Sequence, residues 1–421
     1  MADVRPLRAL HYDLDRVGDP AAVVSPPYDV IDPQQRAELA ARSPHNVVAI
    51  DLPEGEDPYG AAAETFAAWR ADGVLVRDEE PAFWVLTQDY TGPDGRAYTR
   101  HGFFARIRVE DYGPGRIRPH ERTHPGPKED RLKLTRATKA NLSPIFALYD
   151  DPAGAAWGAL ERHLDGAPVA DVADPDGTRH RLWRVADPDT LATVTEALAP
   201  SELLIADGHH RYETARAYAE EVGGDGAHRY VLTCLVALQD PGLTVFPTHR
   251  LLTGLDAAKR EALRDEVLRD WEVTETTLED LEPEPAGTDD PVRLGYLDTG
   301  HRRPLRLTLK DQALVDAALP GRSEAYRHLD TAVLEALVLT GALGMSEDDI
   351  SHFNGLDYSR TTAEARERIL SGDVQAGFFM GATPVAWIRD VAAAGEVMPP
   401  KSTYFFPKVL TGLLFHPLDE E

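Results

Sequence analysis

Segments typical of strands and segments typical of helices follow one another along this chain in mixed order. Residues Phe83 to Asp89 and Tyr98 to Val109 alternate apolar and polar side chains around Gly92-Pro-Asp-Gly95, which predicts a hairpin. The run from Leu203 to Ala206 is typical of a short buried strand, and Tyr212 to Val222 of a helix. This mixed order favours the α+β class, with mixed β-sheets and helices.

Three regions are expected from composition and motif positions. Residues 1–112 form an N-terminal α+β region, and residues 113–280 form a core that carries the main sequence motif. The proline-rich, acidic stretch Leu281 to Pro291 is the best candidate for a linker. A C-terminal α+β region, 292–421, is expected to pack on the core. Residues Leu243 to Leu251 predict one more strand just before the linker.

The charge balance limits the partners of the chain. Its 421 residues include 44 basic and 71 acidic side chains, giving a formal net charge of −27. Such a field repels nucleic acids and anionic membranes, so neither is expected as a partner, and an anionic substrate needs a local basic pocket. The single cysteine, Cys234, excludes an intramolecular disulfide and a cysteine-based zinc cluster. The N-terminus lacks a signal-peptide pattern and no apolar run reaches ~18 residues, which predicts a soluble, cytoplasmic protein.

The sharpest local feature is a junction between a strand and a helix. After the apolar run, Asp207-Gly208 predicts a tight turn, and His209, His210 and Arg211 fall in the first helical turn. A helix N-terminus has unsatisfied N–H groups and the positive end of the dipole, so three basic residues there predict a bound anion such as phosphate. Alternatively, Asp207 is an N-cap and the basic residues form a solvated first turn. A third interpretation places on Asp207 a metal ion that itself binds phosphate.

Two other segments are candidates for a phosphate site. The segment from Arg116 to Lys139 has eight lysines and arginines in an otherwise acidic chain, which indicates either an anion pocket or a solvated helix face. Within it, Glu121 lies between His120 and Arg122 and is a candidate general base. Near the C-terminus, Lys401-Ser402-Thr403 follows two prolines and offers an ammonium group and hydroxyls on a rigid loop. The alternative for this tail is a terminal strand held by its aromatic residues.

Several familiar catalytic motifs are absent from the sequence. It contains no Gly-x-Ser-x-Gly, no Gly-x-Gly-x-x-Gly and no His-Glu-x-x-His, and the tail lacks the upstream glycines of a P-loop. Serine hydrolases of the usual elbow type, Rossmann oxidoreductases, zincins and P-loop NTPases are therefore disfavoured.

Motifs spread over nearly the whole chain resemble a prokaryotic family catalogued as domain of unknown function 1015. The motifs that carry this resemblance are Ser25-Pro-Pro-Tyr-Asp-Val30, His120-Glu-Arg-Thr123, Pro127-Lys-Glu-Asp-Arg-Leu132, Ala140-Asn-Leu-Ser-Pro-Ile-Phe146, Ile205-Ala-Asp-Gly-His-His-Arg-Tyr-Glu-Thr214, Pro247-Thr-His-Arg250 and Met398-Pro-Pro-Lys-Ser-Thr-Tyr-Phe405. They occur in order along the chain, which makes the assignment specific, although the family name implies little about function.

The turn at residues 207–211 is also similar to the phosphate-gripping motif of free L-serine kinases in the ParB/sulfiredoxin-like superfamily. This resemblance implies a ParB/sulfiredoxin-like core elaborated by N- and C-terminal additions. It also implies that Asp207 binds Mg²⁺ or orders the turn, that His209, His210 and Arg211 bind the donor phosphates, and that an earlier glutamate, here Glu121, is the base. We expect Lys128, Arg131, Lys401, Ser402 and Thr403 to assist with phosphate, and His120, Asn141 and Ser143 to bind the acceptor.

The hypothesis from the sequence is a phosphotransferase that acts on the hydroxyl of free L-serine, with Mg²⁺ as cofactor. The donor is pyrophosphate or a nucleotide (ADP or ATP), and the lack of an adenine-type fingerprint mildly favours pyrophosphate. Two alternatives stay open: a phosphate-ester hydrolase that uses the same pocket, and a non-catalytic protein that binds a phosphorylated metabolite. A homodimer is among the assemblies that the sequence allows.

Overall fold

The chain folds into two compact units. The computed structural model describes residues 2–123, 125–285, 287 and 290–419. The first unit comprises Met1–Pro119, Thr123–Leu243 and Pro407–Glu421, and the second comprises His120–Arg122 and Thr244–Phe406. This division differs from the three expected regions, because residues before and after position 112 contribute strands to one sheet and the chain returns to the first unit at Pro407.

The first unit is built on a nine-stranded mixed sheet. Its strands lie in the order β6-β11-β8-β12-β5-β4-β10-β9, and β1 pairs with β5 beside this path. The pairs β11–β6 and β12–β8 are parallel, whereas β8–β11, β5–β12, β4–β5, β4–β10 and β9–β10 are antiparallel. The strands of this sheet are β1 (Val4–Arg5), β4 (Phe83–Thr91), β5 (Ala97–Arg108), β6 (Ile117–Arg118), β8 (Ile145–Tyr149), β9 (Ala170–Ala173), β10 (Arg179–Val185), β11 (Leu203–Asp207) and β12 (Tyr230–Ala237).

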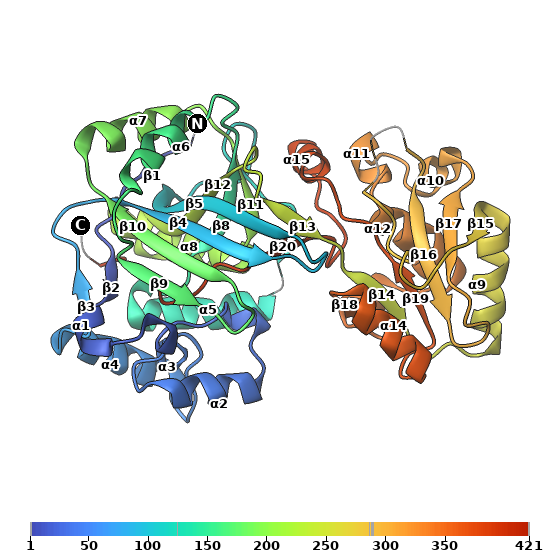
Figure 1. The fold of residues 1–421 in the computed structure, drawn as a ribbon, viewed down its shortest axis with the longest axis horizontal. Coiled ribbons are helices and arrows are strands. Elements are labelled where there is room, and N and C mark those ends of the chain that lie inside the picture. The colour runs from blue at the N-terminus through green and yellow to red at the C-terminus, as the bar shows by residue number, and fades with distance from the viewer. Residues whose placement is uncertain (1, 124, 286, 288–289, 420–421) are drawn as a thin grey trace. The chain divides into compact units, whose positions relative to one another are not determined.

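Helices lie along both sides of this sheet (Figure 1). On one side, Ala156 and Leu160 of α6 and Val194 and Leu198 of α7 pack on alternate strand residues such as Phe103, forming the main core of the unit. The elements outside the sheet are β2 (Leu10–Tyr12), β3 (Leu75–Arg77), β7 (Ala140–Asn141), β21 (His416–Pro417), α1 (Leu14–Val17), α2 (Pro33–Arg42), α3 (Val48–Asp51), α4 (Pro58–Ala71), α5 (Pro125–Thr138), α6 (Ala155–Leu160), α7 (Pro188–Leu198), α8 (His209–Val222) and the 3-10 turns η1 (Pro20–Ala22), η2 (Tyr28–Val30), η3 (Glu161–His163) and η4 (Ala227–Arg229).

The second unit is built on a six-stranded antiparallel sheet in the order β15-β17-β16-β19-β14-β18. One face packs on α9, α10 and a π-helix, and the other on α14. Its elements are β13 (Thr244–Phe246), β14 (His249–Leu252), α9 (Ala257–Asp270), β15 (Trp271–Glu275), β16 (Arg293–Asp298), β17 (Leu305–Leu309), α10 (Gln312–Ala318), α11 (Glu324–Arg327), α12 (Asp330–Val333), the π-helix η5 (Leu334–Ala342), α13 (Glu347–Ser351), β18 (Leu356–Ser359), α14 (Thr362–Ser371), β19 (Ala376–Phe379), α15 (Val385–Ala393) and β20 (Tyr404–Phe406).

The fold confirms the α+β class and the predicted hairpin, which is β4–β5. The strand expected from Leu243 to Leu251 is instead two strands in different sheets, because β13 pairs with β20 and β14 pairs with β18 and β19. Pro247 lies between them, and a proline has no N–H to continue a ladder. No helix in the described ranges is long and apolar enough to span a bilayer.

Close backbone packing at Gly295 gives a first testable prediction. A Cβ at this position of β16 would overlap the carbonyl oxygen of Leu281, so Gly295→Ala is expected to lower the free energy of unfolding by about 2 kcal/mol. Chemical denaturation measures this change. The control is Gly158→Ala, which adds a Cβ in open space within α6 and is expected to leave stability equal or slightly higher. Equal stability of the two variants would contradict the packing argument.

Candidate functional site

The junction between β11 and α8 is shaped by a β-bulge. The residues of β11 pair in register with β8 from Leu203 to Ile205, after which the register shifts and Asp207 lies opposite Phe146. Because directly paired residues share a face of the sheet, the extra residue turns Asp207 away from the α6–α7 core that Ile205 faces. Without the bulge, alternation would direct this carboxylate into that apolar core.

Gly208 makes the turn itself. It is the N-cap of α8 with φ of +91°, a left-handed conformation that favours glycine. A Cβ here would also lie 3.1 Å from the guanidinium carbon of Arg211. The helix therefore begins at His209, three residues earlier than its apolar pattern predicts, and all three basic residues fall in the first turn as expected.

Asp207 accepts hydrogen bonds from two cations. Its Oδ2 accepts from Nη2 of Arg211 at 2.7 Å, and its Oδ1 accepts from Nζ of Lys408. Burial alone would raise the pKa of Asp207, but the Lys408 ammonium and then the Arg211 guanidinium together hold that pKa well below its usual range. Asp207 is thus ionised at neutral pH. In this form it can orient neighbouring cations, but because its pKa is so low it is too weak a proton acceptor to be a general base.

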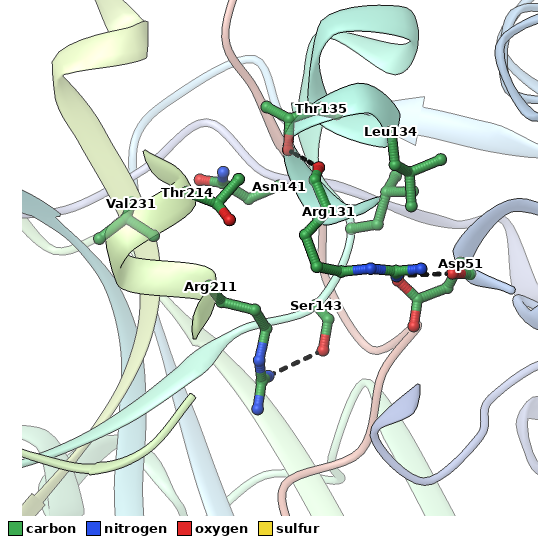
Figure 2. Close-up of a pocket in the computed structure, with 11 residues that line it drawn as sticks. Asp51, Arg131, Leu134, Thr135, Asn141, Ser143, Arg211, Thr214 and Val231 are labelled. Atoms are coloured by element: carbon green, nitrogen blue, oxygen red, sulfur yellow. Dashed lines mark hydrogen bonds and ion pairs between the residues drawn. The ribbon is translucent and has the colours of Figure 1, made fainter. Parts of the chain in front are cut away.

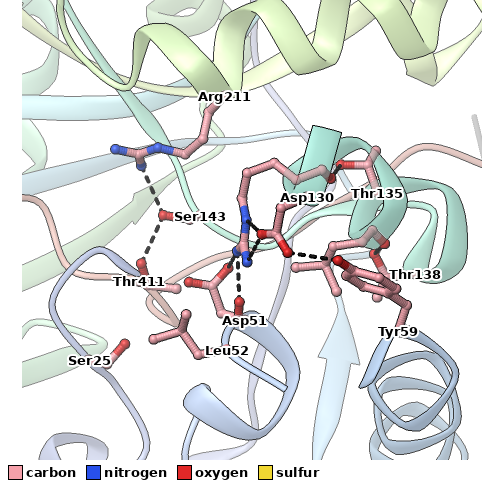
Figure 3. A network of polar contacts seen from close by, with 12 residues as sticks. Ser25, Asp51, Leu52, Tyr59, Asp130, Thr135, Thr138, Ser143, Arg211 and Thr411 are labelled. Carbon is pink, nitrogen blue, oxygen red and sulfur yellow. Dashed lines mark hydrogen bonds and ion pairs between the residues drawn. The ribbon is translucent and has the colours of Figure 1, made fainter. Parts of the chain in front are cut away.

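The Arg211 guanidinium connects this carboxylate to the loop before β8. Its Nη1 donates to Oγ of Ser143 at 2.9 Å and to the carbonyl of Pro144, and Ser143 Oγ lies 2.8 Å from Oγ1 of Thr411 (Figure 3). The Arg211 side chain is 9% exposed. The structure therefore brings Asp207, Arg211 and Ser143 together, three residues that the sequence assigned to one site.

Lys408 is a residue of this cluster that the sequence reasoning did not assign. Its carbonyl accepts from Nε2 of Gln88 at 3.2 Å, and the preceding carbonyl of Pro407 accepts from Nη2 of Arg100 at 2.6 Å. Arg100 is fully buried, donates to Gln88 and lies over the ring of Phe146. The hairpin strand β5 carries Arg100, Arg106 and Arg108, so the sequence alone does not single out the one that is fully buried.

A polar cavity of about 40 Å³ adjoins Arg211 (Figure 2). Eleven residues line it: Asp51, Arg131, Leu134, Thr135, Ala140, Asn141, Leu142, Ser143, Arg211, Thr214 and Val231. Burial raises the pKa of Asp51, and the positive charge of the facing Arg131 partly offsets this rise. The Oδ2 atom of Asp51 is buried and has no hydrogen-bond partner among the described residues. A cavity of this size holds small polar molecules such as water.

The charge of Arg131 is matched within the protein. Its Nη1 donates to the carbonyl of Asp51 at 2.7 Å, its Nη2 donates to Asp130 at 2.6 Å, and its guanidinium lies 4.3 Å from the ring centre of Tyr28. These contacts tie the Ser25–Val30 motif to α5. The predicted contact of Arg131 with phosphate stays a prediction.

The other predicted residues of the first unit lie around the same junction. His209 is buried, His210 is half-buried, and both begin α8. The carbonyl of Lys128 in α5 accepts from Thr214 of α8 at 3.4 Å, which places the first turn of α5 against α8. The Asn141 side-chain oxygen accepts from the backbone N–H of Leu232 at 3.0 Å, so this amide extends the hydrogen bonding of the sheet.

The remaining predicted residues belong to the second unit. His120 is fully buried and its Nε2 lies 2.9 Å from Oγ1 of Thr403, while its carbonyl accepts from Met398. Ser402 is buried, its hydroxyl donates to the carbonyl of Pro399, and its Oγ lies 2.9 Å from Oγ1 of Thr331. Lys401 is exposed and has φ of +57°. The His120 and Lys401 motifs thus form one cluster that also includes the half-buried Glu121.

The residues described do not form a preformed metal site. No group of three or more His, Cys, Asp or Glu side chains within them could hold an ion. Asp207, the predicted ligand, has each oxygen engaged by a cation. A resident Mg²⁺ ion does not fit this arrangement.

Comparison with known proteins decides the family. The profile of the family described as "Protein of unknown function (DUF1015)" matches residues 4–332. The chain belongs to this family. No curated protein sequence matches it.

Solved structures give distant similarities to this DUF1015 protein. A conserved hypothetical protein from Pyrococcus furiosus is 16% identical, with a TM-score of 0.33, over 69% of this chain and 86% of the other. A free serine kinase in complex with AMP is 15% identical, with a TM-score of 0.35, over 69% and 83%. SbnI with C-terminal truncation from Staphylococcus aureus is 14% identical, with a TM-score of 0.38, over 73% and 85%. Similarities this distant assign no activity to the chain.

The ion pairs of Asp207 predict how stability depends on pH. Asp207→Asn removes the carboxylate that pairs with Arg211 and Lys408 and is expected to lower the free energy of unfolding by about 2 kcal/mol at pH 7. Since the pKa of Asp207 is lowered in the folded state, the difference from wild type is complete above about pH 4, the range of an unfolded aspartate. It shrinks as the pH falls below that value.

Chemical denaturation of both proteins from about pH 3 to about pH 7, a range that includes the ordinary aspartate pKa of about 4, tests this prediction. The control is Asp225→Asn, which breaks only the exposed pair with Arg108 and should change stability little. A difference between wild type and Asp207→Asn that persists unchanged at the acidic end would show that Asp207 is not held as a carboxylate.

Proposed function

We propose that this DUF1015 protein transfers a phosphoryl group to a small hydroxyl acceptor, free L-serine. The observation that carries the proposal is the β11–α8 junction, where Arg211 and Lys408 meet a carboxylate that stays ionised at the N-terminus of a helix. Phosphoryl transfer requires positioning and charge neutralisation more than covalent chemistry by the protein. A cluster of oriented cations at the N-terminus of a helix supports that chemistry.

The donor phosphates are proposed to bind at the first turn of α8. In this proposal the phosphates are bound by backbone N–H groups of this turn, by His209 and His210, and by the Arg211 guanidinium. Asp207 accepts a hydrogen bond from Arg211 and so fixes the orientation of its guanidinium. Lys128 and Arg131 stay in the proposal as further phosphate ligands of the first unit. The roles of Lys401, Ser402 and Thr403, which belong to the second unit, stay predictions.

The acceptor hydroxyl needs a base, and Glu121 is proposed for it. A useful base has a pKa near the working pH, and Asp207 is excluded because its pKa is lowered far from that range. His120, Asn141 and Ser143 are proposed to bind the acceptor. Since Asp207 is already engaged by two cations, we propose that Mg²⁺ arrives bound to the donor phosphates, as part of the substrate.

A product assay tests the reaction. The full-length protein is incubated with Mg²⁺, L-serine and either pyrophosphate, ADP or ATP, and products are followed by phosphorus NMR and mass spectrometry. O-phosphoserine with one donor is the expected result and identifies that donor. Release of phosphate without phosphoserine would indicate a phosphate-ester hydrolase. Binding of a phosphorylated ligand without turnover would indicate a non-catalytic protein.

Two variants separate the proposed roles. Glu121→Gln removes the base and is expected to lower kcat by about 10²-fold or more with a small change in KM. Arg211→Lys keeps the charge but loses the planar fork that bonds Asp207 and Ser143, and is expected to raise KM for the donor and lower kcat.

Steady-state kinetics with varied donor and varied serine measure both effects. The matched control is Glu129→Gln, an exposed glutamate that pairs with Lys133 on α5, for which activity should equal that of wild type. Full activity of Glu121→Gln would exclude Glu121 as the base. Full activity of Arg211→Lys would separate the junction from phosphate binding.

A further inference from the structure

A groove of about 600 Å³ lies on the first unit, away from the β11–α8 junction. Its floor is a row of residues on neighbouring strands, in which Thr87 of β4 pairs directly with Arg181 of β10 and with His101 of β5. Its wall comes from α6 and η3, with Trp157, Leu164 and the rim residues Glu161 and Arg162. Thr99 and Trp183 complete the lining.

The groove is formed where the helix layer ends. One step along the same strands, Val85, Phe103 and Trp183 are buried in the core under α6 and α7. At the next row the side chains are polar, although they occupy the same face. On this face the apolar core thus ends at one row, and the next row is the polar floor of a concave surface. Such a change is typical of a binding surface rather than of a continued core.

Two polar atoms of the floor are buried and have no hydrogen-bond partner in the part of the chain that the structure describes. Oγ1 of Thr87 and Nε of Arg181 have no hydrogen-bond partner among the described residues, and Thr87 is only 5% exposed. Leaving such atoms buried and unpaired destabilises the folded state. Both can donate a hydrogen bond, so they indicate a ligand with acceptor atoms.

The other lining groups are held in place by contacts outside the groove. Nδ1 of His101 lies 2.9 Å from Oδ2 of Asp240, and the His101 ring lies 4.7 Å from that of Trp157. Trp183 donates its indole N–H to the carbonyl of Gly166 at 2.9 Å, and Arg181 pairs with Asp89. The imidazole and the two indoles thus have fixed orientations, which lowers the entropy cost of binding a planar ring.

The groove and the junction are separate places on one sheet. The groove lies over β5, β4 and β10 on the face covered by α6 and α7, whereas the bulge directs Asp207 to the opposite face at β11. A ligand in the groove is therefore not the phosphate of the proposed reaction.

We propose that this groove binds a planar aromatic anion, a ring that carries a phosphate or a carboxylate. The indole rings of Trp157 and Trp183 contact the ring, and the donors Arg181, Thr87 and Arg162 bind the anionic group. Glu161 on the rim is the one acidic residue in the lining, so the described groove has more donors than acceptors. This proposal does not depend on the proposed phosphoryl transfer.

Calorimetric titration of the full-length protein tests it with AMP, phenyl phosphate, benzoate and inorganic phosphate. We expect an aromatic anion to bind, and Arg181→Gln and Trp157→Leu each to weaken that binding tenfold or more. Binding of AMP alone would assign a nucleotide, and binding of phenyl phosphate or benzoate alone would assign a simpler aromatic acid. The matched control is Arg179→Gln, which removes an exposed guanidinium two residues along β10 that pairs with Asp171 and does not line the groove.

Two further variants, Thr87→Val and Arg211→Gln, separate binding in the groove from binding at the junction. If the Thr87 hydroxyl donates a hydrogen bond to the ligand, Thr87→Val weakens binding. Thermal stability is expected to be equal or higher, because the substitution removes a hydroxyl that is buried without a partner among the described residues. Arg211→Gln, at the junction, should leave binding of the aromatic anion unchanged. Inorganic phosphate binding as tightly as the aromatic anions, no binding at millimolar concentration, or equal affinity of Arg181→Gln and Arg179→Gln would each overturn the proposal.

Discussion

The interaction on which the first unit depends most is the contact of one carboxylate with two cations. Asp207 accepts from Arg211 on its own helix and from Lys408, which is 201 residues later in the chain. Through Arg211 the same group reaches Ser143 and Pro144 before β8. A strand, a helix, a loop and the C-terminal segment thus meet at one ionised group. Charged hydrogen bonds that are mostly buried fix geometry more strongly than neutral ones do.

This contact exists because of two backbone features rather than a charge pattern. The bulge in β11 moves Asp207 to the face where Arg100 and Gln88 hold the carbonyls of Pro407 and Lys408. The left-handed Gly208 then starts α8 within one residue, which brings Arg211 back over the carboxylate. Any other residue at this turn would meet both an unfavourable φ and the guanidinium itself.

Local patterns predicted the class of the fold and several of its elements. Alternation and turn residues gave the β4–β5 hairpin, and the Asp-Gly-His-His-Arg run gave the start of α8. The sequence could not show that Arg131 is already paired with Asp51 and Asp130, because that pairing is set by distant segments. Nor could it show the division into units, since residues on both sides of position 112 join one sheet. The charge of a basic residue in the sequence therefore does not say which partners that residue has in the fold.

Arg211 and Arg181 lie on opposite faces of the same sheet and differ in the hydrogen bonds that their guanidinium groups make. At the junction, Arg211 donates hydrogen bonds to Asp207 and Ser143, so its guanidinium is held in one orientation. In the groove on the opposite face, Arg181 pairs through one terminal nitrogen with Asp89 and keeps a buried Nε without a partner among the described residues. An oriented but matched cation organises a site, whereas an unsatisfied buried donor indicates an absent acceptor. Unsatisfied atoms are therefore the better guide to ligands that the sequence motifs do not specify.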